Sequence, residues 1–87
     1  MRQAASPSPQ EVEDIINWLR EEARKNRKVS GFYASLDRQD NDWLYFAVRL
    51  EDKQDIYDKA VLLQKLEDAW HKAHPDSWQL LLIPSAE

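Results

Sequence analysis

The chain has no cysteine, which excludes disulfide bonds, thiolate metal sites and a cysteine nucleophile. It has one glycine among 87 residues, so it has no Gly-rich loop to cradle a phosphate. No apolar run approaches the ~20 residues that span a bilayer. The N-terminal residues lack the apolar core of a signal peptide. These absences favour a cytoplasmic domain that is held together by its hydrophobic core and needs no cofactor.

Composition indicates a single folded domain. Hydrophobic residues make up 43% of the chain and include four tryptophans, which argues against a chain disordered throughout. We expect a lead-in over 1–7, one α+β domain over 8–84 and a short tail over 85–87. The formal net charge of −4 argues against general nucleic-acid binding, because such binding depends on neutralising phosphates.

Two stretches have the spacing of amphipathic helices. The first begins at Ser8, where a proline follows and Glu11 stands in capping-box register. Its apolar residues recur every three or four positions and predict a helix over 9–27. The second begins with a cap at Asp55 and continues almost to Pro75.

Three stretches alternate in the manner of strands. We expect strands over 29–36, 43–51 and 77–83, with a polar loop over 37–42 joining the first two. The element order is therefore α-β-β-α-β. A right-handed crossover makes the second and third strands parallel. The third strand lies beside either the second strand or the first.

The strand over 43–51 is apolar on both sides. One side carries Leu44, Phe46, Val48 and Leu50, and the other carries Trp43, Tyr45 and Ala47. In one arrangement the two helices cover opposite faces and bury both sides within the monomer. In the other, both helices pack on one face and leave the second face to a partner. We favour the latter, because two helices and a three-stranded sheet complete a small two-layer domain.

The second face supplies the predicted partner-binding residues. Aromatic side chains are enriched in protein interfaces, so we expect a homodimer or a contact with another protein, and no small-molecule substrate. The predicted residues share one side of the sheet and are Tyr33, Trp43, Tyr45, Leu81 and Ile83.

Glu67, His71 and His74 form a candidate metal site on the second helix. Spacings of four and three residues place them on one helical face, where they can hold a divalent ion. The simpler interpretation is a solvated polar face with histidines at the negative end of the helix dipole. We favour the simpler interpretation and expect no bound metal.

Basic residues gather at the end of the first helix. Their helical spacing allows contact with phosphates, but the same charges also complement the helix dipole and pair with nearby glutamates. We favour the second explanation. The residues concerned are Arg20, Arg24, Arg27 and Lys28.

No arrangement of residues identifies a reaction. The serines lie outside any nucleophile-elbow context, and a chain this short leaves little material to wall a catalytic pocket. We therefore expect a non-catalytic protein-interaction or homodimerisation module. The alternatives are a nucleic-acid-binding module that uses the basic end of the first helix and, third, a small metal-dependent enzyme.

Overall fold

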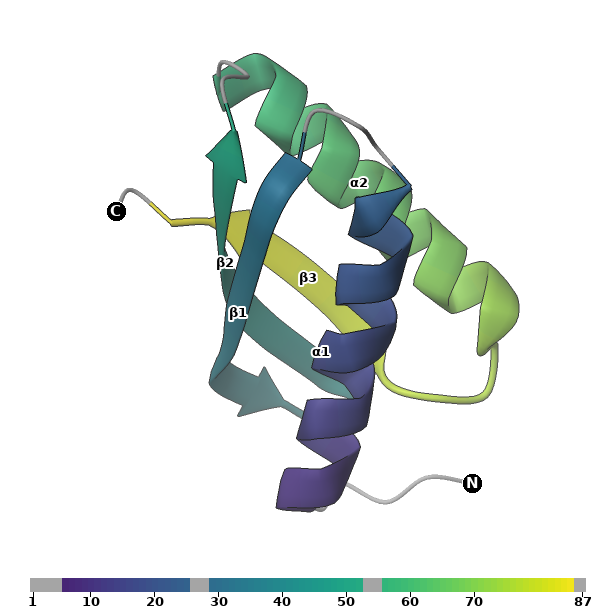
Figure 1. The fold of residues 1–87 in the computed structure, drawn as a ribbon. Coiled ribbons are helices and arrows are strands. Elements are labelled where there is room, and N and C mark those ends of the chain that lie inside the picture. The colour runs from purple at the N-terminus through teal and green to yellow at the C-terminus, as the bar shows by residue number, and fades with distance from the viewer. Residues whose placement is uncertain (1–5, 26–28, 53–55, 86–87) are drawn as a thin grey trace.

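The computed structural model describes residues 6–25, 29–52 and 56–85. The elements are α1 (Pro9–Arg24), β1 (Val29–Asp40), β2 (Trp43–Asp52), α2 (Ile56–Ala73) and β3 (Gln79–Pro84). The strands form one mixed sheet, and both helices lie on the same side of it (Figure 1). The predicted two-layer α+β domain is confirmed. Most of the predicted lead-in and tail, residues 1–5 and 86–87, lies outside the described residues.

The core fills the space between the helices and one face of the sheet. The predicted inward side of β2 is confirmed: its four apolar residues from Leu44 to Leu50 are all buried. The inward faces of the helices show the predicted three-and-four spacing. Buried partners come from every other element and are Ile15, Leu19, Ala23, Phe32, Leu62, Leu63, Leu66, Trp70, Trp78, Leu80 and Leu82.

Local hydrogen bonds fix the ends of α1. The Ser8 hydroxyl accepts a bond from the Glu11 N–H at 3.1 Å, and the Ser8 N–H donates to the Glu11 carboxylate at 3.0 Å, which confirms the capping box. The prediction that this helix reaches residue 27 is wrong at its C-terminus. The helix ends at Arg24 with Lys25 as its cap, and residues 26–28 lie outside the described ranges.

The predicted loop over 37–42 is wrong, because strand pairing continues through most of it. β1 and β2 pair in antiparallel fashion as far as Asp40 opposite Trp43, and the turn between them is Asn41–Asp42. Asn41 has a φ of 55°, which asparagine tolerates better than most residues. A register shift between Leu36 and Arg38 takes up one residue of β1. The polar composition of this segment suggests a loop. The same composition also suits an exposed part of a paired strand, and that is what the structure has.

β3 lies beside β2 and parallel to it, so the sheet order is β1-β2-β3. The strand begins at Gln79, two residues later than predicted, because Trp78 turns into the core and is 2% exposed. The crossover helix α2 is predicted to begin with a cap at Asp55, a residue that lies outside the described ranges. No helix within those ranges combines the length and the hydropathy needed to cross a membrane.

Candidate functional site

The side of the sheet away from the helices carries a mixed aromatic, aliphatic and charged surface. Strand alternation and the pairing register place its side chains in rows across the three strands. We call this surface the open face. Its residues are Tyr33, Ser35, Arg38 and Asp40 of β1, Trp43, Tyr45, Ala47, Arg49 and Glu51 of β2, and Gln79, Leu81 and Ile83 of β3.

Large side chains on the open face are accessible to solvent. Tyr33 is 47% exposed, Trp43 is 38% exposed and Ile83 is 41% exposed, whereas Phe46 on the opposite side of the same sheet is 0% exposed. Single exposed apolar residues are ordinary, whereas large contiguous apolar patches are typical of interaction sites. The alternative in which α1 covers this face is therefore wrong for the described residues.

Arginines lie over two of the tyrosines on this face. The Arg38 guanidinium lies 4.5 Å from the centre of the Tyr45 ring, and the Arg49 guanidinium lies 4.5 Å from the centre of the Tyr33 ring. Arg49 also pairs with the Glu51 carboxylate at 3.1 Å. Each exposed cation–π contact stabilises by about 0.5–1 kcal/mol. These contacts favour one position of each ring.

All five predicted partner-binding residues lie on the open face, although their role in binding stays a prediction. Sequence reasoning missed Arg38, because the register shift at Asp37 moves Arg38 into the row of Tyr45. Nothing in the sequence marks that shift. Arg49 continues the alternation of Trp43, Tyr45 and Ala47, so the strand pattern alone places it on this face.

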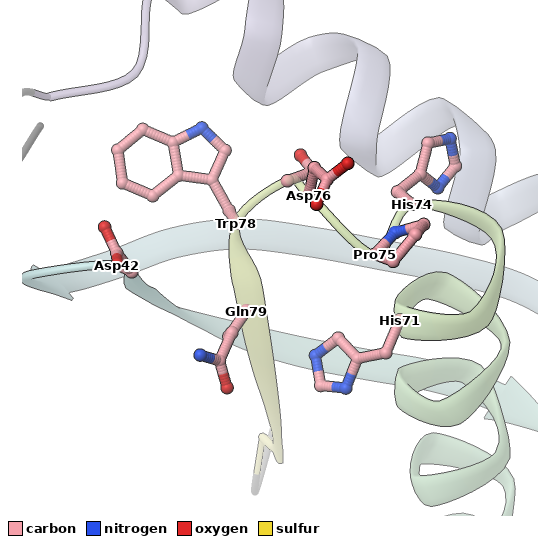
Figure 2. A pocket seen from close by; sticks show the side chains of 8 residues that line it. Asp42, His71, His74, Pro75, Asp76, Trp78 and Gln79 are labelled. Atoms are coloured by element: carbon pink, nitrogen blue, oxygen red, sulfur yellow. The ribbon is translucent and has the colours of Figure 1, made fainter. Parts of the chain in front are cut away.

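Two of the candidate metal ligands serve the backbone of β3 instead. The Leu82 N–H donates to the Glu67 carboxylate at 2.7 Å, and the Leu80 N–H donates to Nε2 of His71 at 3.1 Å. Figure 2 shows the His71 side chain extending from α2 toward β3. These side chains satisfy the outward-facing donors of a strand at the edge of the sheet. Glu67 and His71 are therefore half-buried and bonded to the strand, rather than lying on a fully solvated face.

The third candidate, His74, packs with tryptophans. Its ring stacks on Trp70 with centroids 3.9 Å apart, and Trp18 meets both rings edge-on. The Trp70 indole N–H donates to the Trp78 carbonyl at 2.9 Å. Among the described residues, no three His, Asp or Glu side chains come together as metal ligands. The helical spacing is real, but the three side chains serve different structural contacts.

Burial perturbs one carboxyl in this group. Desolvation raises the pKa of Glu67 above its ordinary value, although the hydrogen bond from Leu82 and the nearby His71 act in the opposite direction. The folded protein therefore holds a proton on Glu67 more tightly than the unfolded chain does. The hydrogen bond to β3 comes with a desolvation cost for the ionised carboxylate.

A hollow of about 480 Å³ lies between the end of α2, the start of β3 and the turn at Asp42 (Figure 2). Its polar lining includes Asp42, His71, Asp76 and Gln79. His71 is engaged with the Leu80 N–H, and the Gln79 N–H donates to the Asp42 carbonyl at 2.9 Å. These bonds join the end of α2, the start of β3 and the turn at Asp42.

The two described members of the basic cluster have local partners on α1. Arg20 donates to the Asn17 side chain at 2.7 Å, and Arg24 lies 3.7 Å from the Glu21 carboxylate. Both line a small hollow of about 200 Å³ beside Tyr33. The other two predicted members, Arg27 and Lys28, lie outside the described residues. Arg24 shows the predicted pairing with a nearby glutamate, whereas Arg20 bonds to an uncharged amide; whether this cluster contacts phosphate stays a prediction.

Comparison with known protein families, with curated proteins and with solved structures finds no significant match for this chain.

Proposed function

We propose that this chain is a non-catalytic protein-interaction module whose contact surface is the open face. The observation that carries the proposal is the exposure of Tyr33, Trp43 and Ile83 on a sheet whose other face is covered by two helices. Covering such a surface removes apolar area from water, which stabilises a complex by roughly 25 cal/mol per Å². Tyr, Trp and Arg are also the residues that most often dominate binding energy.

The ordered rings on this face further support the proposal. The contacts of Arg38 with Tyr45 and of Arg49 with Tyr33 favour one position of each ring, which lowers the side-chain entropy lost on binding. The polar side chains elsewhere point to structural roles, since Glu67 and His71 are already engaged with the backbone of β3.

Site-specific photocrosslinking in cells tests the proposal. A photoreactive phenylalanine at Tyr45 places the probe in the centre of the open face, and the same probe at Tyr57 is the matched control, because Tyr57 is a tyrosine of α2 that is 73% exposed. We expect a discrete protein adduct from position 45, identified by mass spectrometry, and none of comparable yield from position 57. No adduct from position 45, or equal adducts from both positions, would refute the proposal.

A further inference from the structure

The open face contains both halves of a self-complementary pattern. Its central row consists of Ser35, Ala47 and Ile83. The row toward the hairpin turn contains Arg38 beside Tyr45, and the row on the other side contains Tyr33 beside Arg49. Arginine and tyrosine thus exchange places between the two strands on either side of the small residue Ala47.

We propose that the partner of the open face is a second copy of this chain, stacked face to face about a two-fold axis that crosses the strands at Ala47. This arrangement rests on the proposed function, because it requires the open face to be the contact surface. A two-fold interface needs a patch that complements itself, so that each residue pair occurs twice. The alternating arginines and tyrosines meet that requirement.

The pairs across the axis follow from the register. A two-fold rotation about an axis across the strands sets β1 over β1 of the second copy and β2 over β2 of the second copy. The facing strands then run in opposite directions. Arg38 then faces Tyr33 of the second copy, and Tyr45 faces Arg49 of the second copy, so each guanidinium gains a second aromatic ring. Ala47 allows close approach at the axis, and Ile83 meets Ile83 of the second copy.

Charge favours this axis over a two-fold axis that runs along β2. An axis along β2 keeps each row on itself and sets Arg49 over Arg49 of the second copy, which brings like charges together. The open face as a whole balances Arg38 and Arg49 against Asp40 and Glu51. A strongly acidic or strongly basic partner therefore finds no net attraction on this face.

The outer edge of β3 offers no competing mode of association. Pairing through an exposed edge strand needs free backbone donors, and the donors of Leu80 and Leu82 are already bound by His71 and Glu67. The sheet face stays accessible while this edge is closed, which favours stacking over edge-to-edge pairing at β3.

The size of the open face predicts a weak dimer. Three strands about 4.8 Å apart and a ten-residue strand rising about 3.3 Å per residue give a face of roughly 14 by 33 Å, or about 460 Å² before surface relief. A standard interface buries about 800 Å² per partner. The dimer should therefore depend on concentration and be sought up to about 1 mM chain.

Single cysteines test the arrangement cleanly, because the chain has none of its own. Ala47→Cys places one thiol at the axis, where a short bis-maleimide should link two copies. Two Trp43 positions lie eight residues apart along the strand direction in the proposed dimer, about 26 Å, which is beyond the reach of this reagent. Trp43→Cys should not link to itself, but it should link to Glu51→Cys when the two variants are mixed, one of them ¹⁵N-labelled. Gln64→Cys on the exposed side of α2 is the control for random collisions.

The outcomes separate this arrangement from the proposed function. Two results together support the proposed arrangement, in which the facing strands run in opposite directions. Ala47→Cys links to itself, and Trp43→Cys of one copy links to Glu51→Cys of the other. Self-linkage of Trp43→Cys overturns this arrangement in favour of the axis along β2. Linkage of Ala47→Cys no stronger than that of Gln64→Cys at about 1 mM overturns the second copy as partner. In that last case, a photocrosslink from Tyr45 to a different protein would leave the proposed function standing.

Discussion

Replacing Glu67 with glutamine tests the hydrogen bonds that close the outer edge of β3. Glutamine keeps an oxygen that can accept the Leu82 N–H, now 2.7 Å from the Glu67 carboxylate, but it carries no charge to be desolvated. Glu67→Ala removes the acceptor altogether. A hydrogen bond to a charged group contributes about 1.5–3 kcal/mol, and partial exposure of Glu67 places this one toward the lower end. We expect Glu67→Ala to lose about 1–2 kcal/mol of unfolding free energy.

The dependence of this effect on pH follows from the direction of the pKa shift. Because burial raises the pKa of Glu67 in the folded state, the folded protein binds this proton more tightly than the unfolded chain. The contribution of Glu67 to stability is fully present below the unfolded pKa and is lost as pH rises through the folded pKa. Glu67→Gln has no such loss, so it should gain stability relative to wild type from about pH 4.5 upward.

Urea unfolding of both proteins between about pH 4 and pH 7 measures this difference. Carboxyl groups that do not interact with Glu67 titrate in both proteins and cancel in the comparison. Glu13→Gln, on the exposed side of α1, is the control for removing a carboxylate without a buried partner. A Glu67→Gln variant that is less stable than wild type at pH 7, or a difference that does not change with pH, would refute the reasoning.

Three further predictions concern the two faces, the turn and the tryptophan cluster. Phe46→Ala should cost about 3–5 kcal/mol of stability, because it empties a fully buried site. Tyr45→Ala should cost about 0.5–1 kcal/mol in the isolated chain, the size of one cation–π contact. If urea unfolding gives the same loss of stability for Tyr45→Ala as for Phe46→Ala, both faces of the sheet are covered. Asn41→Val should cost about 1–2 kcal/mol and Asn41→Gly almost nothing, because position 41 has a positive φ; equal melting temperatures would contradict this. His74→Ala should cost about 0.5–1.5 kcal/mol by removing the stack on Trp70, with or without a chelator, and a chelator-dependent loss would instead indicate a bound metal.

The open face could be predicted because one strand carries two different alternating patterns. The buried set around Phe46 and the less buried set around Tyr45 follow from side-chain alternation alone. Alternation does not show which face the helices cover. The prediction that both cover the same face rests on size, because two helices and a three-stranded sheet already complete a two-layer domain. The capping box at Ser8 could also be predicted from the sequence, because it depends only on two residues three positions apart.

Features that depend on neighbours distant in sequence were not predictable. The register shift near Asp37 moves Arg38 onto the open face, and it is a property of the paired strands rather than of either strand alone. Glu67 and His71 have the spacing of metal ligands, but their role is set by β3 lying beside α2. Helical spacing shows that these side chains share a direction, and only the fold shows what lies in that direction.

The closed edge of β3 has a consequence for how far assembly can proceed. A sheet that presents free strand edges can add further copies without limit, in the manner of a fibre. Here two side chains of α2 occupy backbone donors at one end of the sheet, and any copy that approaches through β3 must first displace them. Substitutions that remove both Glu67 and His71 would keep the fold but free the backbone N–H groups of Leu80 and Leu82, to which a strand of another copy could pair. We therefore expect Glu67 and His71 to oppose strand addition at β3, so that their loss causes slow aggregation before unfolding.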